Sequence, residues 1–503
     1  MPKKKAATKR PTRAKRAVPP EAAAPDVLDL KEAAEFLKVS KPTFFRWLAQ
    51  DRIKGFKAGQ QWRFYRADLE AFLKTEEPSA LRVDGDGLRS AVDKGRRKRG
   101  LPAVKWQVKE EATSEESAVI QTVNTIIGDA LDARASDIHL DHEHEATIVR
   151  YRTDGVLGEV LRLPREAGWA IVSRLKLMGD MDILERRLPQ HGRISIERSG
   201  REYDLRLTTI AAMFGESAIL RILDQSSVLV GLDKLGFSKQ MQASFEEKLR
   251  VNTGMVIIAG PAGSGRTTTL YSALQSVNSP EKKIVTIEDP VEYRIPNAMQ
   301  VHVNRKVGLT TAAALRTIVR CDPDFIVVGE LKDKETAVNC VNAAMTGHLV
   351  LTTMHGREAP SVVTRLIEMG VEPFLVGSSL VAVLAQRLAR RVCEHCRTED
   401  TPNPDLMARL HKETSIDLAR TEFRRGKGCA ECRQTGYRGR ISLFELLVVD
   451  EGLRELIARP ASTADIRAAA IEAGMTTLLA DGVEKAARGV TTVAEVMRVL
   501  AIE

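Results

Sequence analysis

The sequence has no stretch that approaches the roughly 20 apolar residues of a membrane-spanning helix. Its first 20 residues contain no aspartate or glutamate, and no apolar run of signal-peptide length follows their basic residues. Cysteine is scarce, with six residues among 503. These absences argue against a membrane-spanning protein and against a secreted, disulfide-rich one. They predict a soluble, cytoplasmic chain, whose length suits three or four domains.

The positive charge of the chain is concentrated at one end. Eight units of the net charge of +9 come from Lys3, Lys4, Lys5, Lys9, Arg10, Arg13, Lys15 and Arg16. The rest of the chain is therefore nearly neutral. A basic tail rich in alanine and proline can contact nucleic acid, acidic lipid or acidic protein. Such a composition is also typical of a solvated arm, and we predict a disordered basic tail over residues 1–25.

Residues 26–74 have the pattern of a small helix-turn-helix domain. The stretch DLKEAAEFLKVSKPTFFRWLAQ predicts two short helices around a turn at residues 39–40, because Ser40 suits a helix N-cap and Pro42 suits a first helical turn. The stretch GFKAGQQWRFYRADLEAFL predicts a hairpin that turns near Gly59, followed by a short helix. With E-A-A-x-x-L-x-V-S and W-R-x-x-R-x-D-L-E-A, this segment resembles the excisionase-like (MerR-type) winged helix-turn-helix domains.

That resemblance implies two alternative partners for residues 26–74. In a DNA-binding domain of this kind, the second helix enters the major groove and the hairpin contacts phosphates. The side chains available for these contacts are Lys41, Thr43 and Arg46 on the helix and Lys57 and Arg63 on the hairpin. Domains of this shape also dock proteins, so DNA and a docking protein both stand as partners.

The next two segments differ in regularity. Residues 75–115 are polar and charged and contain the cluster GRRKRG, which favours a flexible linker. From Ser117 onward, helix-like and strand-like stretches alternate as far as Asp224. Residues 116–225 are therefore predicted to form a mixed α/β lobe, with helices over 118–133 and 167–178.

Buried parallel strands are predicted from residue 232 onward. The runs MVIIAG, KIVTIE, FIVVGE and LVLTTMH are short and continuously apolar, as strands buried on both faces of a parallel sheet are. Each run ends in a residue that can serve chemistry or a turn, and ligands gather at the carboxyl ends of such strands. We predict a nucleotide-binding domain over 232–392 and a helical C-terminal region over 438–503.

The stretch GPAGSGRTTT follows the first of these strands and precedes a helix that begins near Thr267. It matches the phosphate-loop pattern G-x-x-x-x-G-K-[ST] except that Arg266 replaces the lysine. The glycines let backbone N–H groups turn toward phosphate oxygens, and the helix N-terminus adds favourable charge. The predicted nucleotide-binding residues are Gly260, Pro261, Ala262, Gly263, Ser264, Gly265, Arg266, Thr267 and Thr268. The Thr267 hydroxyl is placed to bind Mg²⁺.

Acidic residues lie at the ends of two later strands. Glu288 and Asp289 follow KIVTI, and FIVVG lies between Asp324 and Glu330. Carboxylates beside a phosphate loop can hold Mg²⁺ through water, or can orient and deprotonate the attacking water.

Two histidines bracket the strand LVLTTM. His348 precedes the strand and His355 follows it, so the two imidazoles are expected at opposite ends. A lone histidine is usually structural. His355 falls where the strand leaves toward the nucleotide, and we predict a sensor or positioning role for it.

These motifs, with ASDIHL, RYRTDGVL, ERRLPQHGRI, GLTTAAALR, AQRLARRVC and GCAECRQTGYRGR, make residues 119–447 resemble the secretion ATPases of type II secretion and type IV pilus assembly. The resemblance implies an α/β fold in which a RecA-like P-loop ATPase domain follows a PAS-like lobe. It also implies a homohexamer of two-lobed subunits that lies peripheral to the inner membrane and acts on a platform protein there. Arg206 in DLRLTT and Arg221 in AILRIL match the arginines that reach the triphosphate. The implied catalytic set is Glu288, Glu330, Arg206, Arg221 and His355.

Four of the six cysteines form two C-x-x-C pairs. Cys393 with Cys396, and Cys429 with Cys432, are separated by 32 residues, and four thiolates suit a structural Zn²⁺. The resemblance includes this zinc-binding insert, over 393–437. His395 is an alternative fourth ligand, and disulfides are the alternative that a cytoplasmic setting disfavours. The remaining cysteines are predicted to be buried apolar residues.

Four departures from the family pattern surround the nucleotide site. They are Arg266 for the loop lysine, Lys332 for the arginine of G-E-I-R-D, Cys321 for a glutamine, and Gly356–Arg357–Glu358 for T-N-D. An arginine keeps the charge of lysine but is bulkier and planar, so the rate of hydrolysis is the property most exposed to the change.

The sequence thus predicts an ATP-hydrolysing motor with Mg²⁺ and Zn²⁺ as cofactors, and three roles stand beside one another. The first is a motor for type II secretion or type IV pilus assembly. The second is a nucleotide-binding regulator with weak or no hydrolysis that uses its helix-turn-helix module. The third is a motor for DNA uptake.

Overall fold

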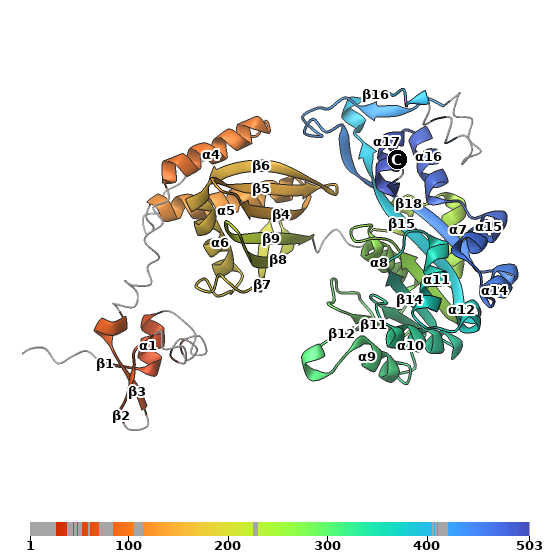
Figure 1. The fold of residues 1–503 in the computed structure, drawn as a ribbon, viewed down its shortest axis with the longest axis horizontal. Coiled ribbons are helices and arrows are strands. Elements are labelled where there is room, and N and C mark those ends of the chain that lie inside the picture. Colours follow the sequence, from red (N-terminus) through yellow and green to blue (C-terminus); the bar gives the residue numbers. More distant parts are fainter. Residues whose placement is uncertain are drawn as a thin grey trace, which may run out of the picture. The chain divides into compact units, whose positions relative to one another are not determined.

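In the computed structural model of the chain, residues 27–37, 44, 48, 53–58, 61–69, 84–104, 114–224, 230–404, 407, 410 and 421–501 are described. Figure 1 shows their helices and strands. The chain divides into two units, residues 1–82 and 83–503, and each is considered separately below. Within the described ranges, no helix is both long and apolar enough to cross a membrane.

The first unit contains a three-stranded antiparallel sheet, the helix α1 and a helical stretch at residues 66–69. Its elements are β1 (Val27–Asp29), α1 (Leu30–Phe36), β2 (Phe56–Ala58) and β3 (Gln61–Tyr65), with sheet order β1-β3-β2. Asp29 caps α1 by accepting hydrogen bonds from the N–H groups of Lys31 and Glu32. Ala58 lies opposite Gln61, so the predicted hairpin is confirmed. Lys41, Thr43 and Arg46 of the predicted second helix lie outside the described residues, as does the basic tail.

A helix occupies part of the predicted linker. Residues Gly85–Lys98 form α4, whose Leu88 and Val92 are fully buried in the core of the following lobe. Beyond its C-terminus, Arg99 donates a hydrogen bond to Asp129 on α5 (Ser114–Asp132), a distance of 3.0 Å. The prediction of a flexible linker is therefore wrong for this stretch, because two apolar side chains four residues apart and a basic C-terminal end attach it to the lobe.

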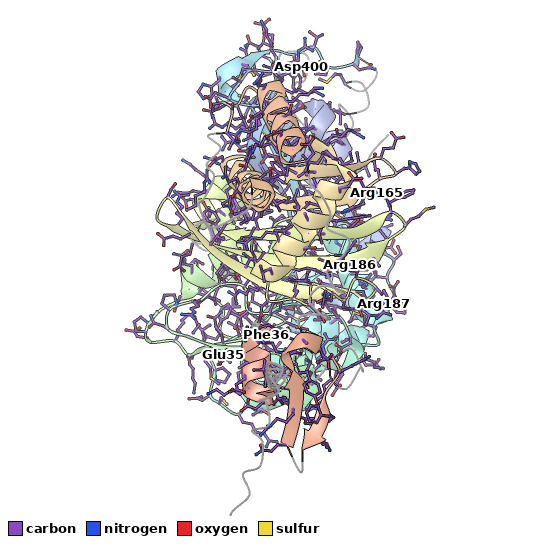
Figure 2. All side chains as sticks on the ribbon, turned by 90° about the vertical axis from the view of Figure 1, so that its left-hand side faces the viewer. Glu35, Phe36, Arg165, Arg186, Arg187 and Asp400 are labelled. Carbon is purple, nitrogen blue, oxygen red and sulfur yellow. The ribbon has the colours of Figure 1, made fainter. Side chains whose placement is uncertain are left out.

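The lobe that follows is a six-stranded antiparallel sheet with helices α5 and α6 packed against it. The strand order is β6-β5-β4-β9-β8-β7. The bounds are β4 (Ala135–His142), β5 (Ala146–Thr153), β6 (Val156–Pro164), α6 (Arg165–Met178), β7 (Gln190–Arg198), β8 (Arg201–Ala212) and β9 (Gly215–Asp224). The apolar faces of α5 and α6 share one core cluster with alternate residues of the strands. Figure 2 shows Arg186 and Arg187 among the outward-pointing side chains, in the loop before β7.

The next part is built on a seven-stranded sheet of order β12-β11-β13-β14-β10-β15-β18, parallel except for the pair β15/β18. Its strands are β10 (Gly254–Ala259), β11 (Ile284–Glu288), β12 (Ala298–His302), β13 (Phe325–Val328), β14 (Leu349–Met354), β15 (Leu380–Val392) and β18 (Tyr437–Val448). Its helices are α7 (Lys239–Lys248), α8 (Arg266–Val277), α9 (Thr311–Ile318), α10 (Lys334–Met345), α11 (Ala359–Glu368) and α12 (Pro373–Ser379). Strands β10, β11, β13 and β14 are buried at every position, as the apolar runs predict.

The predicted helical C-terminal region begins with a strand. Strand β18 pairs with β15 along its length, from Tyr437 opposite Val392 to Val448 opposite Ala382. The prediction over 438–503 is therefore wrong for its first eleven residues, where the apolar run ISLFELLV completes the sheet. Four helices follow: α14 (Glu451–Ile457), α15 (Thr463–Glu472), α16 (Leu478–Ala487) and α17 (Val493–Leu500).

Buried carboxylates attach these C-terminal helices to the sheet. Glu445 on β18 accepts a hydrogen bond from the N–H of Ala359, at 2.6 Å, and another from the N–H of Leu478, at 3.2 Å. It therefore caps α11 and α16 at the same time. Glu495 on α17 accepts from the guanidinium and the N–H of Arg390 on β15 and from Arg498. Burial opposes its ionisation, but these donors hold the pKa of Glu495 at about 2.

Candidate nucleotide site

The phosphate loop lies between the end of β10 and the start of α8 (Figure 1). Gly263 and Gly265 have φ values of 75° and 86°, a left-handed conformation that favours glycine. Gly265 is the N-cap of α8 and offers no side-chain cap to the first turn. The N–H groups at the start of α8 are therefore available to an anion, and the helix dipole favours one there.

Two buried polar atoms of the loop are available for hydrogen bonds to a ligand. Among the described residues, neither the hydroxyl of Ser264 nor the Nη1 of Arg266 has a hydrogen-bond partner. A buried donor without an acceptor costs free energy of about 1–3 kcal/mol. A phosphate group bound in the loop would supply acceptor oxygens, so the residues present fit a nucleotide. Gln386 on β15 fixes the helix behind the loop by accepting a hydrogen bond of 2.8 Å from Thr269.

Glu330 follows β13 and is contacted by two basic side chains and a histidine. Its Oε1 lies 3.2 Å from Arg266 Nη2 and 3.1 Å from His355 Nε2, and its Oε2 lies 2.8 Å from Lys332 Nζ. Strands β13, β14 and β10 are neighbours in the sheet, which brings Glu330, His355 and the loop to the same edge. Burial raises the pKa of Glu330, but the hydrogen bond from Lys332 and the charges of Arg266, Lys332 and His355 outweigh it. The net pKa lies below the ordinary value, so the carboxylate is ionised.

Glu288 at the end of β11 is buried and fully engaged. It accepts hydrogen bonds from Tyr271 on α8, from Thr286 at 2.7 Å and from Gln300 at 3.0 Å. Burial and the bond to Glu288 raise the pKa of Tyr271, so the phenol stays protonated and donates. Tyr271 was not among the residues predicted from the sequence. Its place in TTTLY, one turn into α8, is the only signal that could have pointed to it.

A cavity of about 680 Å³ connects these groups. Loop residues Ala262, Gly263, Arg266 and Thr267 line it, and so do Tyr271, Glu288, Asp289, Glu292, Glu330, Lys332 and Arg221. Thr267 thus faces the space where its hydroxyl can reach a cation. Glu292 is a second residue that the sequence reasoning missed. Burial raises its pKa, the charge of Glu288 adds to this, and Arg206 and Arg221 oppose it.

The two lobe arginines lie on neighbouring strands. Arg206 on β8 is directly opposite Arg221 on β9. Arg221 donates a hydrogen bond of 3.1 Å to Asp137 on β4, and its side chain remains 68% exposed. The structure brings Arg221 to the cavity. Arg206 is absent from the cavity-lining residues that the structure describes, although its charge acts on Glu292.

Residues 112–498 match the family Type II/IV secretion system protein, and residues 27–76 match the helix-turn-helix domain family. The chain belongs to the Type II/IV secretion system protein family. It is 45% identical over 386 residues to the type IV pilus assembly ATPase PilB of Myxococcus xanthus, covering 76% of this chain and 68% of that protein. It is 43% identical over 385 residues to the type II secretion system protein E of Pseudomonas aeruginosa, covering 76% of each. By this membership the chain is an ATPase.

The fold agrees with that membership. The X-ray structure of the Legionella pneumophila ATPase DotB superposes with a TM-score of 0.56 at 18% identity, covering 76% of this chain and 95% of that one. This likeness shows the fold alone. It confirms the RecA-like domain and the preceding mixed α/β lobe that the sequence of this secretion ATPase predicts.

Two other predicted residues of the secretion ATPase lie away from the cavity. Asp324 precedes β13 and accepts a hydrogen bond of 2.7 Å from the N–H of Lys283, which precedes β11. It therefore belongs to the opposite edge of the sheet from Glu330 and plays no part in the site. His348 precedes β14 and contacts the carbonyl oxygen of Ala343 at 3.0 Å, a structural contact. The predicted placement of His348 and His355 at opposite ends of the strand is confirmed.

The four paired cysteines gather at one point. Their sulfur atoms all lie within 4.8 Å of one another, with Cys393–Cys429 at 3.9 Å, Cys396–Cys432 at 3.8 Å and Cys429–Cys432 at 3.7 Å. A tetrahedral Zn²⁺ with bonds of 2.3 Å separates its sulfur ligands by about 3.8 Å, so the cluster fits the ion. His395 is not a member of the cluster, and the described cysteines form no disulfide. Of the two lone cysteines, Cys340 is buried as predicted, whereas Cys321 is only half-buried.

Proposed function

We propose that this chain is a hexameric ATPase motor that powers a type II secretion or type IV pilus assembly machine. The observation that carries the proposal is the position of the phosphate loop and Glu330 at the same edge of the sheet. Two buried donors of the loop have no acceptor in the part of the chain that the structure describes, and Arg266 in the loop contacts Glu330 directly. A site of this kind has a place for the triphosphate and a carboxylate beside it.

The reaction that we propose is in-line attack of water on the γ-phosphorus of ATP. The bond from phosphorus to the oxygen shared with ADP breaks, and the proton of the water passes to Glu330 or to the departing phosphate. While Arg266, Lys332 and His355 all contact Glu330, the carboxylate is a weak base. A phosphate oxygen can draw a basic partner away from Glu330, so nucleotide binding would raise the basicity of Glu330 at the moment it is needed. Mg²⁺, held through Thr267, would neutralise charge on the phosphates.

The lobe arginines supply the link between hydrolysis and motion in this proposal. Arg221 lines the cavity, and within the described residues Asp137 is its one ion-pair partner; Asp137 is itself shared with Arg152 at 3.5 Å. A largely exposed arginine at the mouth of a nucleotide site can move to the γ-phosphate and stabilise charge in the transition state. Movement of the lobes would then act on a platform protein at the cytoplasmic face of the inner membrane.

ATP turnover of the purified assembly tests the proposal. Native protein is expected to release phosphate at least about 100-fold faster than Glu330→Gln, the usual loss when a general base is removed. Glu368→Gln, an exposed carboxylate at the end of α11, is the matched control and should retain native turnover. Equal rates for native protein and Glu330→Gln would refute the motor. Size measurement with and without ATP tests the hexamer independently.

The helix-turn-helix unit has basic side chains that could bind a partner of its own. Lys57 lies 5.3 Å from the ring centre of Trp62, and Arg63 donates to Gln61, so both cations are held on the hairpin. We propose that this hairpin contacts nucleic-acid phosphates. A mobility-shift experiment with the full chain should show a salt-sensitive shift that Lys57→Ala with Arg63→Ala weakens. The absence of a shift at moderate salt would leave protein docking as the role of the unit.

A further inference from the structure

The two basic side chains that flank Glu330 differ in their freedom to move. Arg266 is 14% exposed and its guanidinium is held by Glu330 Oε1. Lys332 is 56% exposed and its ammonium contacts Glu330 Oε2. The arginine is therefore fixed inside the site, whereas the lysine reaches in from the surface on a flexible stem.

A phosphate loop works with a cation that follows the phosphates. Lysine suits this task because its charge is compact and its stem is flexible, whereas arginine presents a planar fork. The loop of this chain lacks that lysine, since Arg266 occupies its position. Lys332 lines the same cavity as Gly263 and Thr267, and it is the one lysine among the described lining residues.

The remaining cations of the cavity are less suited to the task. Arg305 is 71% exposed but is paired with Asp289 at 2.9 Å, and Arg221 is held by Asp137. Among the described residues, Glu330 is the one ion-pair partner of Lys332, and Glu330 is also contacted by Arg266 and His355. Losing Lys332 to a ligand would leave Glu330 still paired with Arg266 and in contact with His355. Exchange of Lys332 from carboxylate to phosphate is thus the least costly rearrangement in the site.

We propose that Lys332 supplies the mobile ammonium that binds the terminal phosphate of ATP, while Arg266 remains on Glu330. The proposal rests on the ATPase function proposed above. In this proposal Lys332 and Arg266 share the role that a single lysine has in phosphate loops of the usual pattern. Lys332 is then a phosphate-binding residue, and Arg266 is a positioning residue that acts through Glu330.

Separate affinities for ATP and ADP test this assignment on the full chain. Lys332→Ala is expected to weaken ATP binding by about tenfold or more and to change ADP binding less than about threefold, because the contact is to the terminal phosphate. Lys334→Ala, an exposed lysine at the start of α10, is the matched control and should change neither. A Lys332→Ala protein with native affinity for both nucleotides would overturn the proposal, and so would an equal loss for both.

A second substitution, in the phosphate loop, gives a sharper test by asking whether it restores ATP affinity. Arg266→Lys in the Lys332→Ala background should recover most of the lost ATP affinity, because it returns a lysine to the phosphates from the other side. If Lys332 only paired with Glu330, Lys332→Ala would cause no ATP-specific loss for Arg266→Lys to recover, and the proposal would fail. Unfolding temperature checks that each variant is folded. Both readouts are binding measurements, so they stand even if the native chain proves unable to hydrolyse ATP, which would refute the motor alone.

Discussion

Tyr271 and Glu288 join helix α8 to the end of strand β11 through a hydrogen bond between two buried side chains. The phosphate loop leads into the start of α8, and the segment with Asp289 and Glu292 follows β11. The hydroxyl of Tyr271 also accepts a weak contact of 3.4 Å from the N–H of Tyr293 in that segment. The phenol thus ties the phosphate loop's helix to the acidic segment that faces the lobe arginines.

Removal of this hydroxyl should be costly. Tyr271→Phe leaves Glu288 with two donors, Thr286 and Gln300, in a buried place. We expect the free energy of unfolding to fall by about 1–3 kcal/mol, because a buried carboxylate loses a partner. Denaturant unfolding measures the change. Tyr203→Phe on β8 is the comparison, and a loss of equal size there would show that the bond to Glu288 is not the cause.

The acid stability of the C-terminal region should depend on Glu495. Its folded pKa of about 2 lies below the ordinary carboxyl value of 4.5, so ionised Glu495 stabilises the fold fully above pH 4.5. That contribution, on the order of 3 kcal/mol, is lost as the pH falls from about 4.5 toward 2. Glu495→Gln should therefore be less stable than native protein at pH 7 and should lose less stability on acidification. Parallel pH dependences of the two proteins would contradict the assignment.

Metal analysis should find about one zinc ion per chain. Cys432→Ser removes a ligand that also accepts hydrogen bonds from the N–H groups of Cys429 and Gly436. This variant is expected to lose the ion and to expose the segment near the cysteines to protease. Cys321→Ser changes a cysteine outside the cluster and should keep both the ion and the protection. Native protein without zinc, when purified without chelators, would argue against the site.

Arg221 should affect turnover more than nucleotide binding. It lines the cavity and is largely exposed, so its contact with the triphosphate would form in the closed state that precedes reaction. Arg221→Ala is expected to lower kcat by about 100-fold or more, with an ATP affinity within a few-fold of native. Arg198→Ala removes an arginine that pairs with Asp132 on α5, and it serves as the control. Unchanged kcat in Arg221→Ala would exclude its role at the triphosphate.

The parallel sheet and the phosphate loop were predictable because local patterns specify them. Four continuously apolar runs gave the central strands, and glycine spacing gave the loop between β10 and α8. The position of His355 and Glu330 at the same edge follows from strand direction alone. The cysteine cluster was predictable from its two short spacings.

Other features depend on contacts between distant residues, which a local pattern does not reveal. The sequence of α4 resembles a charged linker because Leu88 and Val92 are its two buried residues. The hydrogen bond that Arg99, just after α4, donates to Asp129 joins residues far apart in the sequence, so a local pattern does not reveal it. The three partners of Glu330 come from the start of α8 and from the segments that follow β13 and β14, so their convergence is a property of the sheet order. Tyr271 and Glu292 can be recognised as site residues only when their neighbours across the cavity are known.

The pairing of β15 with β18 makes the cysteine segment the turn of a hairpin. Its 44 residues, 393–436, begin at Cys393 directly after β15 and end four residues after Cys432. A turn of that length closes at a substantial entropic cost. A Zn²⁺ held by the four thiolates would link Cys393 to Cys432 at the base of this segment, where β16 (Arg397–Glu399) and β17 (Arg424–Gly426) also pair, and would thereby lower the entropic cost of pairing β15 with β18. Such an ion would hold the last strand of the ATPase sheet in place, and its loss would loosen the sheet from that strand inward.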